Sequence, residues 1–130
     1  MAQFLNNTNK SYDLEERTAK FSEDVVNFVK KINRNDINRD IIRQLIRSAT
    51  SIGANYCEAN ASSSRRDFKN KIYICKKEAN ETKYWLRILA QAELSLKDEI
   101  RKLWKEVHQF HLIFQKITST MDKKKNVKEV

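Results

Sequence analysis

A single glycine and the complete absence of proline limit the folds that this 130-residue chain can adopt. Sheet-rich folds and phosphate-cradling loops use many tight turns, and glycine supplies the positive φ angles that such turns need. Long helices with short connections are compatible with this composition. Apolar residues make up 40% of the chain, which suffices for a core and argues against disorder over most of its length.

Four segments repeat their apolar residues at intervals of three and four, as amphipathic helices do. Asp13 and Ser64 are suited to cap the first and third segments, and the polar run 33–36 is suited to a turn. The short connections predict an all-α fold, an antiparallel up-down-up-down four-helix bundle, with a flexible N-terminus at 1–12 and a basic flexible tail at 122–130. The expected helices span about residues 13–33, 37–60, 65–92 and 95–120.

The third and fourth segments carry the most regular apolar seams. In the third segment the seam consists of Phe68, Ile72, Cys75, Ala79, Thr82, Leu86 and Leu89. In the fourth it consists of Leu96, Ile100, Leu103, Val107, Phe110, Phe114, Ile117 and Met121. Gly53 lies in a run of small residues in the second segment. Glycine costs a helix about 1 kcal/mol relative to alanine, so we expect another helix to approach closely there, within the chain or between chains.

The sequence has no feature of a secreted or membrane-spanning protein. It begins without a basic region and apolar run of the signal-peptide type, and no apolar stretch is long enough to span a bilayer. Cys57 and Cys75 lack the spacing of a zinc site or a disulfide framework, and are expected to be buried thiols. We therefore expect a cytoplasmic protein without a cofactor.

The net charge of +9 is concentrated on two helical stripes. Basic side chains with interleaved aromatics suit a nucleic-acid backbone, because cations displace counterions and tyrosine can stack on a base. Acids are scarce on both stripes. The alternative is a merely solvated face, and the net charge of +9 favours polyanion binding over it. The candidate contacts are Arg39, Arg43 and Arg47 in the second segment, and Arg65, Lys69, Lys76, Lys77, Lys83 and Arg87 in the third, with Tyr73 and Tyr84 as stacking candidates.

A second group of residues on the middle segments is neither clearly core nor clearly solvent-facing. These residues either complete the core of the monomer or form the interface of a homo-oligomer. The acids among them are suited to pair with arginines of another helix or subunit. The candidate interface residues are Ile42, Ile46, Gly53, Ile74, Glu78, Glu81, Trp85 and Ile88.

Enzymatic functions have little support in the sequence. A di-iron site in a helical bundle requires Glu-x-x-His on two helices, and that motif does not occur. His108 and His111 are three residues apart, but no acid occupies a matching helical position, so a metal site is not expected. Neither cysteine has a neighbouring base for nucleophilic catalysis. We therefore predict a protein that is not an enzyme.

Three sequence blocks resemble a known family. Asp13–Phe21 (DLEERTAKF), Gln44–Ala59 (QLIRSATSIGANYCEA) and Lys77–Leu86 (KEANETKYWL) are similar to the four-helix bundle proteins encoded in 23S rRNA intervening sequences, over about residues 12–120. That family is in turn similar to the accessory protein of diversity-generating retroelements, a basic homopentamer that binds nucleic acid and a reverse transcriptase.

The resemblance implies partners and a surface for this chain. It implies a homopentamer, RNA or DNA binding, and a reverse transcriptase as partner in a retroelement context. The family's basic surface would correspond to Arg47, Lys76, Lys77 and Lys83, although Cys57 occupies a position that is often basic in relatives. Our leading prediction is a nucleic-acid-binding oligomer. The alternative is a protein-interaction or structural oligomer whose charge serves solubility.

Overall fold

The computed structural model describes residues 13–129, with side chains from 13 to 123. Within that range the chain is all-α, with no strand. A short 3₁₀-helix, η2 (Leu94–Leu96), connects the last two α-helices. The predicted flexible segment 1–12 lies outside the described residues. The four α-helices are α2 (Leu14–Val29), α3 (Asn38–Asn60), α4 (Arg65–Ala92) and α5 (Lys97–Glu129).

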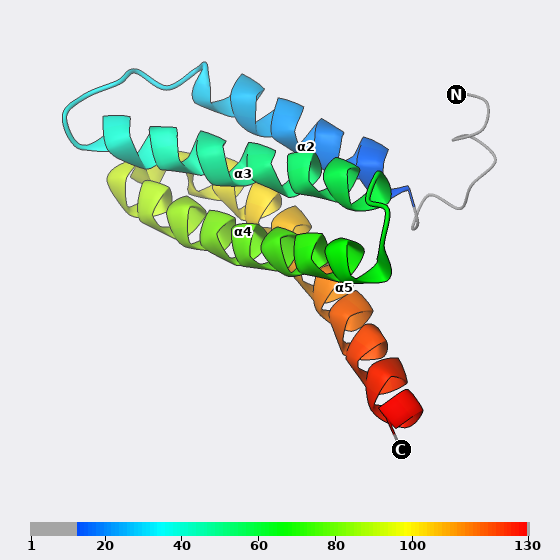
Figure 1. Cartoon of the computed structure of the whole chain (residues 1–130). Coiled ribbons are helices and arrows are strands. Elements are labelled where there is room, and N and C mark those ends of the chain that lie inside the picture. The colour runs from blue at the N-terminus through cyan, green and yellow to red at the C-terminus, as the bar shows by residue number, and fades with distance from the viewer. Residues whose placement is uncertain (1–12, 130) are drawn as a thin grey trace.

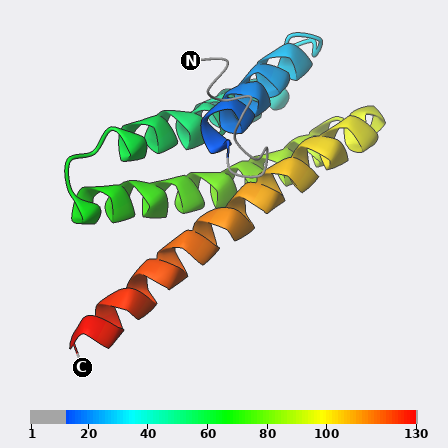
Figure 2. The same cartoon turned by 90° about the vertical axis from the view of Figure 1, so that its right-hand side faces the viewer.

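The α3 and α4 helices form the centre of the fold. α3 packs against α2 and α4, and α4 also packs against α5, whereas α2 and α5 have few contacts with each other (Figure 1). Figure 2 shows that the C-terminal part of α5 diverges from the other helices.

Polar side chains start three of the helices. The Glu16 amide donates to Asp13 Oδ1 at 3.3 Å, and the Asp67 amide donates to Ser64 Oγ at 3.0 Å, so both predicted caps are confirmed. In the turn before α3, Asn35 Oδ1 accepts from the amides of Ile37 and Asn38, each at 2.9 Å. These bonds satisfy amides that a helix start leaves without an intrahelical partner.

Two helix ends differ from the sequence prediction. α2 ends at Val29 rather than near residue 33, because the Arg34 guanidinium donates to the carbonyls of Val29 (2.8 Å) and Ile32 (3.1 Å) and satisfies them in a turn. α5 continues to Glu129, where the prediction placed its end near residue 120 and a flexible tail beyond. The lysine-rich tail contains no glycine or proline, and lysine and glutamate favour helices.

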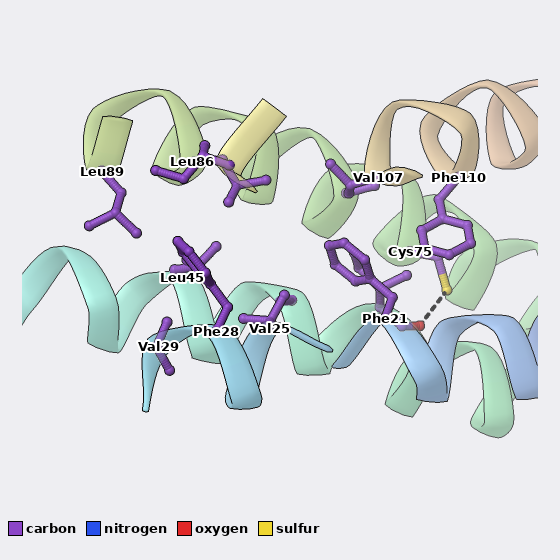
Figure 3. Packing of buried hydrophobic residues seen from close by; sticks show 14 of the residues in the cluster. Phe21, Val25, Phe28, Val29, Leu45, Cys75, Leu86, Leu89, Val107 and Phe110 are labelled. Carbon is purple, nitrogen blue, oxygen red and sulfur yellow. Dashed lines mark hydrogen bonds between the residues drawn. The ribbon is translucent and has the colours of Figure 1, made fainter. Parts of the chain in front are cut away.

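The buried core follows the predicted seams. Phe21 of α2 and Phe110 of α5 meet edge to face with ring centroids 5.5 Å apart. Val25, Leu45 of α3, Leu86 of α4 and Val107 are fully buried in the same cluster (Figure 3). The core thus joins all four helices.

The two cysteines have different environments. Cys75 is buried, its thiol donates to the Ile52 carbonyl at 3.5 Å (Figure 3), and burial raises its pKa to about 12. Cys57 is exposed, so the prediction of two buried thiols is wrong for this residue. Cys57 lies near the end of α3 on the side away from the core, where a helical face meets solvent.

Gly53 marks the close approach of two helices. A methyl group at this position would lie 3.1 Å from Thr18 Oγ1 and 3.3 Å from Thr18 Cβ, so glycine lets α2 and α3 pack at short distance. Thr18 is itself buried and donates from Oγ1 to the Leu14 carbonyl at 2.6 Å. The close contact expected at Gly53 is therefore within the chain.

Candidate nucleic-acid interface

The three predicted arginines of α3 all have acidic partners. Arg39 lies 3.5 Å from Asp36 and Arg43 lies 3.4 Å from Asp40. Both pairs are exposed, and exposed pairs contribute little to stability, but each carboxylate offsets the charge of its arginine. The expectation that acids are scarce on this stripe is therefore wrong.

Arg47 is held more firmly than the other two arginines. Its guanidinium contacts Glu78 Oε2 at 3.2 Å and Glu81 Oε1 at 2.5 Å, both from α4. Glu81 Oε1 also accepts from the Trp85 indole at 3.3 Å. The Glu78 side chain is only 6% exposed, so Arg47 is the counter-ion of a buried carboxylate. Its role in this structure is to join α3 to α4, and it is poorly placed to contact a phosphate.

The predicted stripe on α4 lies along the boundary with α5. Lys69 forms an ion pair with Asp122 of α5, and Tyr73 donates from its hydroxyl to Asp122 Oδ2 at 2.7 Å. Lys77 lies off this stripe, exposed and 3.8 Å from Glu78 Oε1. Asp122 thus offsets the charge at one point of the boundary.

Four of the predicted α4 cations have no carboxylate partner among residues 13–123. Arg65 and Arg87 are exposed, and Lys76 and Lys83 are partly buried at the α5 boundary. Lys76 lies with its ammonium 5.3 Å from the Tyr73 ring centroid. We call these residues the α4 cation row, which consists of Arg65, Lys76, Lys83 and Arg87.

Two histidines of α5 accompany this row, although the sequence did not place them there. Lys83 Nζ lies 3.0 Å from His108 Nδ1 and 3.5 Å from His111 Nδ1. Their spacing of three residues was the only available signal, because it puts both on one helix face. Which helix that face meets depends on packing between α4 and α5.

The two stacking candidates differ in accessibility. Tyr84 is 55% exposed and touches Trp85 edge to face, with centroids 5.1 Å apart. Tyr73 is 38% exposed, but its hydroxyl is held by Asp122 and its ring is near the ammonium groups of Lys69 and Lys76. Tyr84 is thus the freer of the two rings.

The structure divides the predicted interface residues into two groups. Ile42 and Gly53 are buried inside the bundle, so neither is available to another copy of the chain, and Glu78 is buried beside Arg47. α3 packs against both α2 and α4, and therefore has a broad apolar face. In sequence, such a face cannot be told apart from one that meets another copy of the chain. The residues that stay partly exposed are Ile46, Ile74, Glu81, Trp85 and Ile88.

An apolar cleft of about 840 Å³ opens where α5 leaves the other helices. Arg17 and Lys116 are among the polar residues that line it. Arg17 is also bonded to both carboxylate oxygens of Glu106, at 3.0 and 2.8 Å, which ties α2 to α5 above the cleft. The apolar lining consists of Leu14, Tyr56, Phe68, Ile113, Ile117 and Met121.

No group of three or more histidine, cysteine or acidic side chains among the described residues could hold a metal ion. None of the helices described is both long enough and apolar enough to cross a membrane.

Comparison with known proteins places the chain in a family. Residues 10–126 match the family of the 23S rRNA-intervening sequence protein. The chain belongs to this family. The match covers α2, α3, α4 and α5 up to residue 126, so the family assignment extends beyond the blocks from which the resemblance was inferred.

A solved structure supports the family assignment and the fold. The chain is similar to a protein of unknown function from the S23 ribosomal protein family of Bacteroides thetaiotaomicron VPI-5482, with 31% identity and a TM-score of 0.71. The similarity covers 80% of this chain and 96% of that chain. Among curated proteins, none matches the sequence.

Proposed function

We propose that this protein is a non-enzymatic helical bundle that binds RNA or DNA through sequence-nonspecific electrostatic contacts along α4. The observation that carries the proposal is the α4 cation row, four basic residues without carboxylate partners within the described side chains. From Arg65 to Arg87 the row extends about 33 Å along the helix, at 1.5 Å per residue. A row of this length can contact several successive phosphates of one strand.

Electrostatics and geometry favour α4 over α3 for this role. On α3 each predicted arginine has an acid beside it, and Arg47 is committed to Glu78 and Glu81. On α4 the row retains its positive charge, and exposed Tyr84 lies on the same helix. Neutralising phosphates with such cations releases counterions, which is the main source of non-specific affinity.

A salt titration tests this proposal. Labelled oligouridylate and oligothymidylate are titrated with the protein at several salt concentrations, and binding is followed by fluorescence anisotropy. Four contacts to single strands predict a slope of about −3 in a plot of log affinity against log salt, at about 0.7 per contact. Absence of binding, or an affinity that salt does not change, would contradict the proposal.

The proposal includes assembly into a homopentamer of up-down-up-down bundles. Short connections between consecutive helices support that helix order. Ile74, Trp85 and Ile88 are only partly buried, on the flank of α4 opposite the cation row. A second copy of the chain covering this flank would leave the cation row open to nucleic acid.

Light scattering measures the assembly directly. The expected mass in solution is about five times the 15.4 kDa of the chain. Changing Trp85 to glutamate should reduce that mass, whereas Leu112 to glutamate, on an exposed α5 position, is the matched control. A monomer at micromolar concentration would refute the pentamer.

A protein-interaction role is the second candidate, and the apolar cleft favours it. A cleft with this lining suits a partner that presents apolar side chains. In this alternative the protein binds neither oligonucleotide in the salt titration. The two candidates are thus separated by the same experiment.

A further inference from the structure

One lysine and two histidines meet where α4 packs against α5. Lys83 Nζ faces the Nδ1 atoms of both His108 and His111, at 3.0 and 3.5 Å. The same ammonium lies 5.0 Å from the centroid of the Trp104 ring, which stacks on His108 with ring centroids also 5.0 Å apart. Two histidines and a lysine are therefore packed together beside the Trp104 ring.

This cluster has no negative partner among residues 13–123. No carboxylate in that range forms an ion pair with Lys83 or Lys76. The charged and titratable groups that influence His111 are Lys83 and Lys76 from α4 and His108 from α5. All of them are basic, so the cluster lacks the counter-ion that a group of cations normally has in a folded protein.

The absence of an acid affects the protonation of the histidines. A neutral imidazole accepts a hydrogen bond from the Lys83 ammonium, whereas a protonated imidazole repels it. Burial lowers the pKa of His111 below its ordinary value, and the charges of Lys83, His108 and Lys76 lower it further. An anion bound between these groups would counteract the positive charges that lower the pKa of His111.

We propose that Lys76, Lys83, His108 and His111 form a phosphate-binding site whose affinity increases as His111 becomes protonated. This inference rests on the proposed function in one respect, because it takes a nucleic acid as the source of the phosphate. The phosphate accepts hydrogen bonds from the lysine ammoniums at any physiological pH. The protonated imidazole adds a further donor when the pH falls.

The direction of the pH effect follows from linkage. A bound anion stabilises the imidazolium, so binding raises the histidine pKa and takes up a proton. Affinity therefore increases as the pH falls through the interval between the pKa of the bound state and the lower pKa of the free state. A rise of about one pKa unit on binding corresponds to about a tenfold increase in affinity across that interval.

The sequence makes the experiment clean, because its only two histidines both lie in this cluster. The imidazole proton resonances are titrated by NMR with and without pyrophosphate, and then with oligouridylate. We expect both additions to raise the pKa of His111. In parallel, the affinity for oligouridylate is expected to rise about tenfold between about pH 7.5 and pH 5.5 in the wild type, and to change little in His108→Gln/His111→Gln.

Further variants separate the site from general charge effects and from misfolding. Lys83→Gln should abolish the pyrophosphate effect on His111, whereas Lys105→Gln, an exposed α5 lysine, should preserve it. Lys83→Arg keeps the charge and should retain part of the effect. Circular dichroism and the NMR spectra verify that each variant is folded.

The outcomes distinguish this inference from the proposed function. If pyrophosphate raises the His111 pKa but oligonucleotides do not bind, the phosphate site stands and the nucleic-acid function fails. If oligouridylate binds with the same pH dependence in the double histidine variant, or binds without shifting the pKa of His111, the phosphate site is refuted while the nucleic-acid function stands.

Discussion

Replacing Lys76, Lys83 and Arg87 together with glutamate is expected to weaken binding of oligouridylate roughly 100-fold or more at about 0.1 M salt. Between about 1 M and about 0.1 M salt each contact to a single strand adds about fivefold to affinity, because log affinity changes by about 0.7 per contact for a tenfold change in salt. Anisotropy titrations measure the loss, and the magnitude of the salt slope should fall by about 0.7 for each contact removed.

A matched variant controls for net charge. Lys31, Arg39 and Arg43 are also exposed cations, and changing them to glutamate alters the net charge by the same amount on the α2–α3 side of the bundle. This variant should lose far less affinity. If both variants lose the same affinity, binding follows total charge, and the α4 cation row is not the binding surface.

The second large effect is expected at Arg47. Arg47→Met leaves the buried Glu78 carboxylate without its main cation, with only Lys77 at 3.8 Å. Arg47 is itself half-exposed, so the expected loss of unfolding free energy is about 2–3 kcal/mol, between the values for surface pairs and for buried pairs. Urea denaturation measures it.

A double variant identifies the cause of that loss. Glu78→Gln together with Arg47→Met removes both charges, and should recover most of the stability, since the cost arises from an unpaired buried carboxylate. Lys20→Met breaks the exposed pair with Asp24 and should cost less than about 1 kcal/mol. A loss in the double variant that equals or exceeds that of Arg47→Met would contradict this explanation.

The contact between Arg47 and Glu81 also determines how the stability of the protein changes at acid pH. The hydrogen bond from Arg47, with a further one from Trp85, holds the pKa of Glu81 below its ordinary value, although burial opposes this shift. A lowered pKa in the fold stabilises the protein above the ordinary glutamate pKa, and this contribution disappears as the pH falls through the lowered value. In Arg47→Met the unfolding free energy should therefore fall less than in the wild type as the pH falls from the ordinary glutamate pKa through the lowered pKa of Glu81.

The sequence predicted the helices well because their apolar periodicity has a single interpretation. In the α4 seam every residue except Phe68 is buried. Four residues of the fourth segment's seam are partly buried, and its buried residues are Ile100, Val107, Phe110 and Phe114. The cap residues Asp13 and Ser64 act locally. The end of α2 was not predictable, since it depends on the Arg34 side chain folding back onto carbonyls that precede it.

The candidate site was predicted only in part, because a periodic pattern gives the face of a helix but not its neighbour. The α4 stripe is visible in sequence, yet the acids that neutralise Arg47 and Lys69 come from other helices. For the same reason the position of His108 and His111 beside Lys83 required the packing of α5 on α4. The sequence leaves Ile42 open between the core and an oligomer interface, and the structure shows that it is buried in the core.

The contact between Gly53 and Thr18 has a consequence for how this chain can vary. Helix propensity alone would favour alanine at position 53, while the threonine of α2 leaves no more than 3.1 Å for the added methyl group. The constraint therefore belongs to the pair of positions. An exchange of Gly53 for alanine becomes acceptable when Thr18 is replaced by a smaller residue, and each substitution determines whether the other is tolerated.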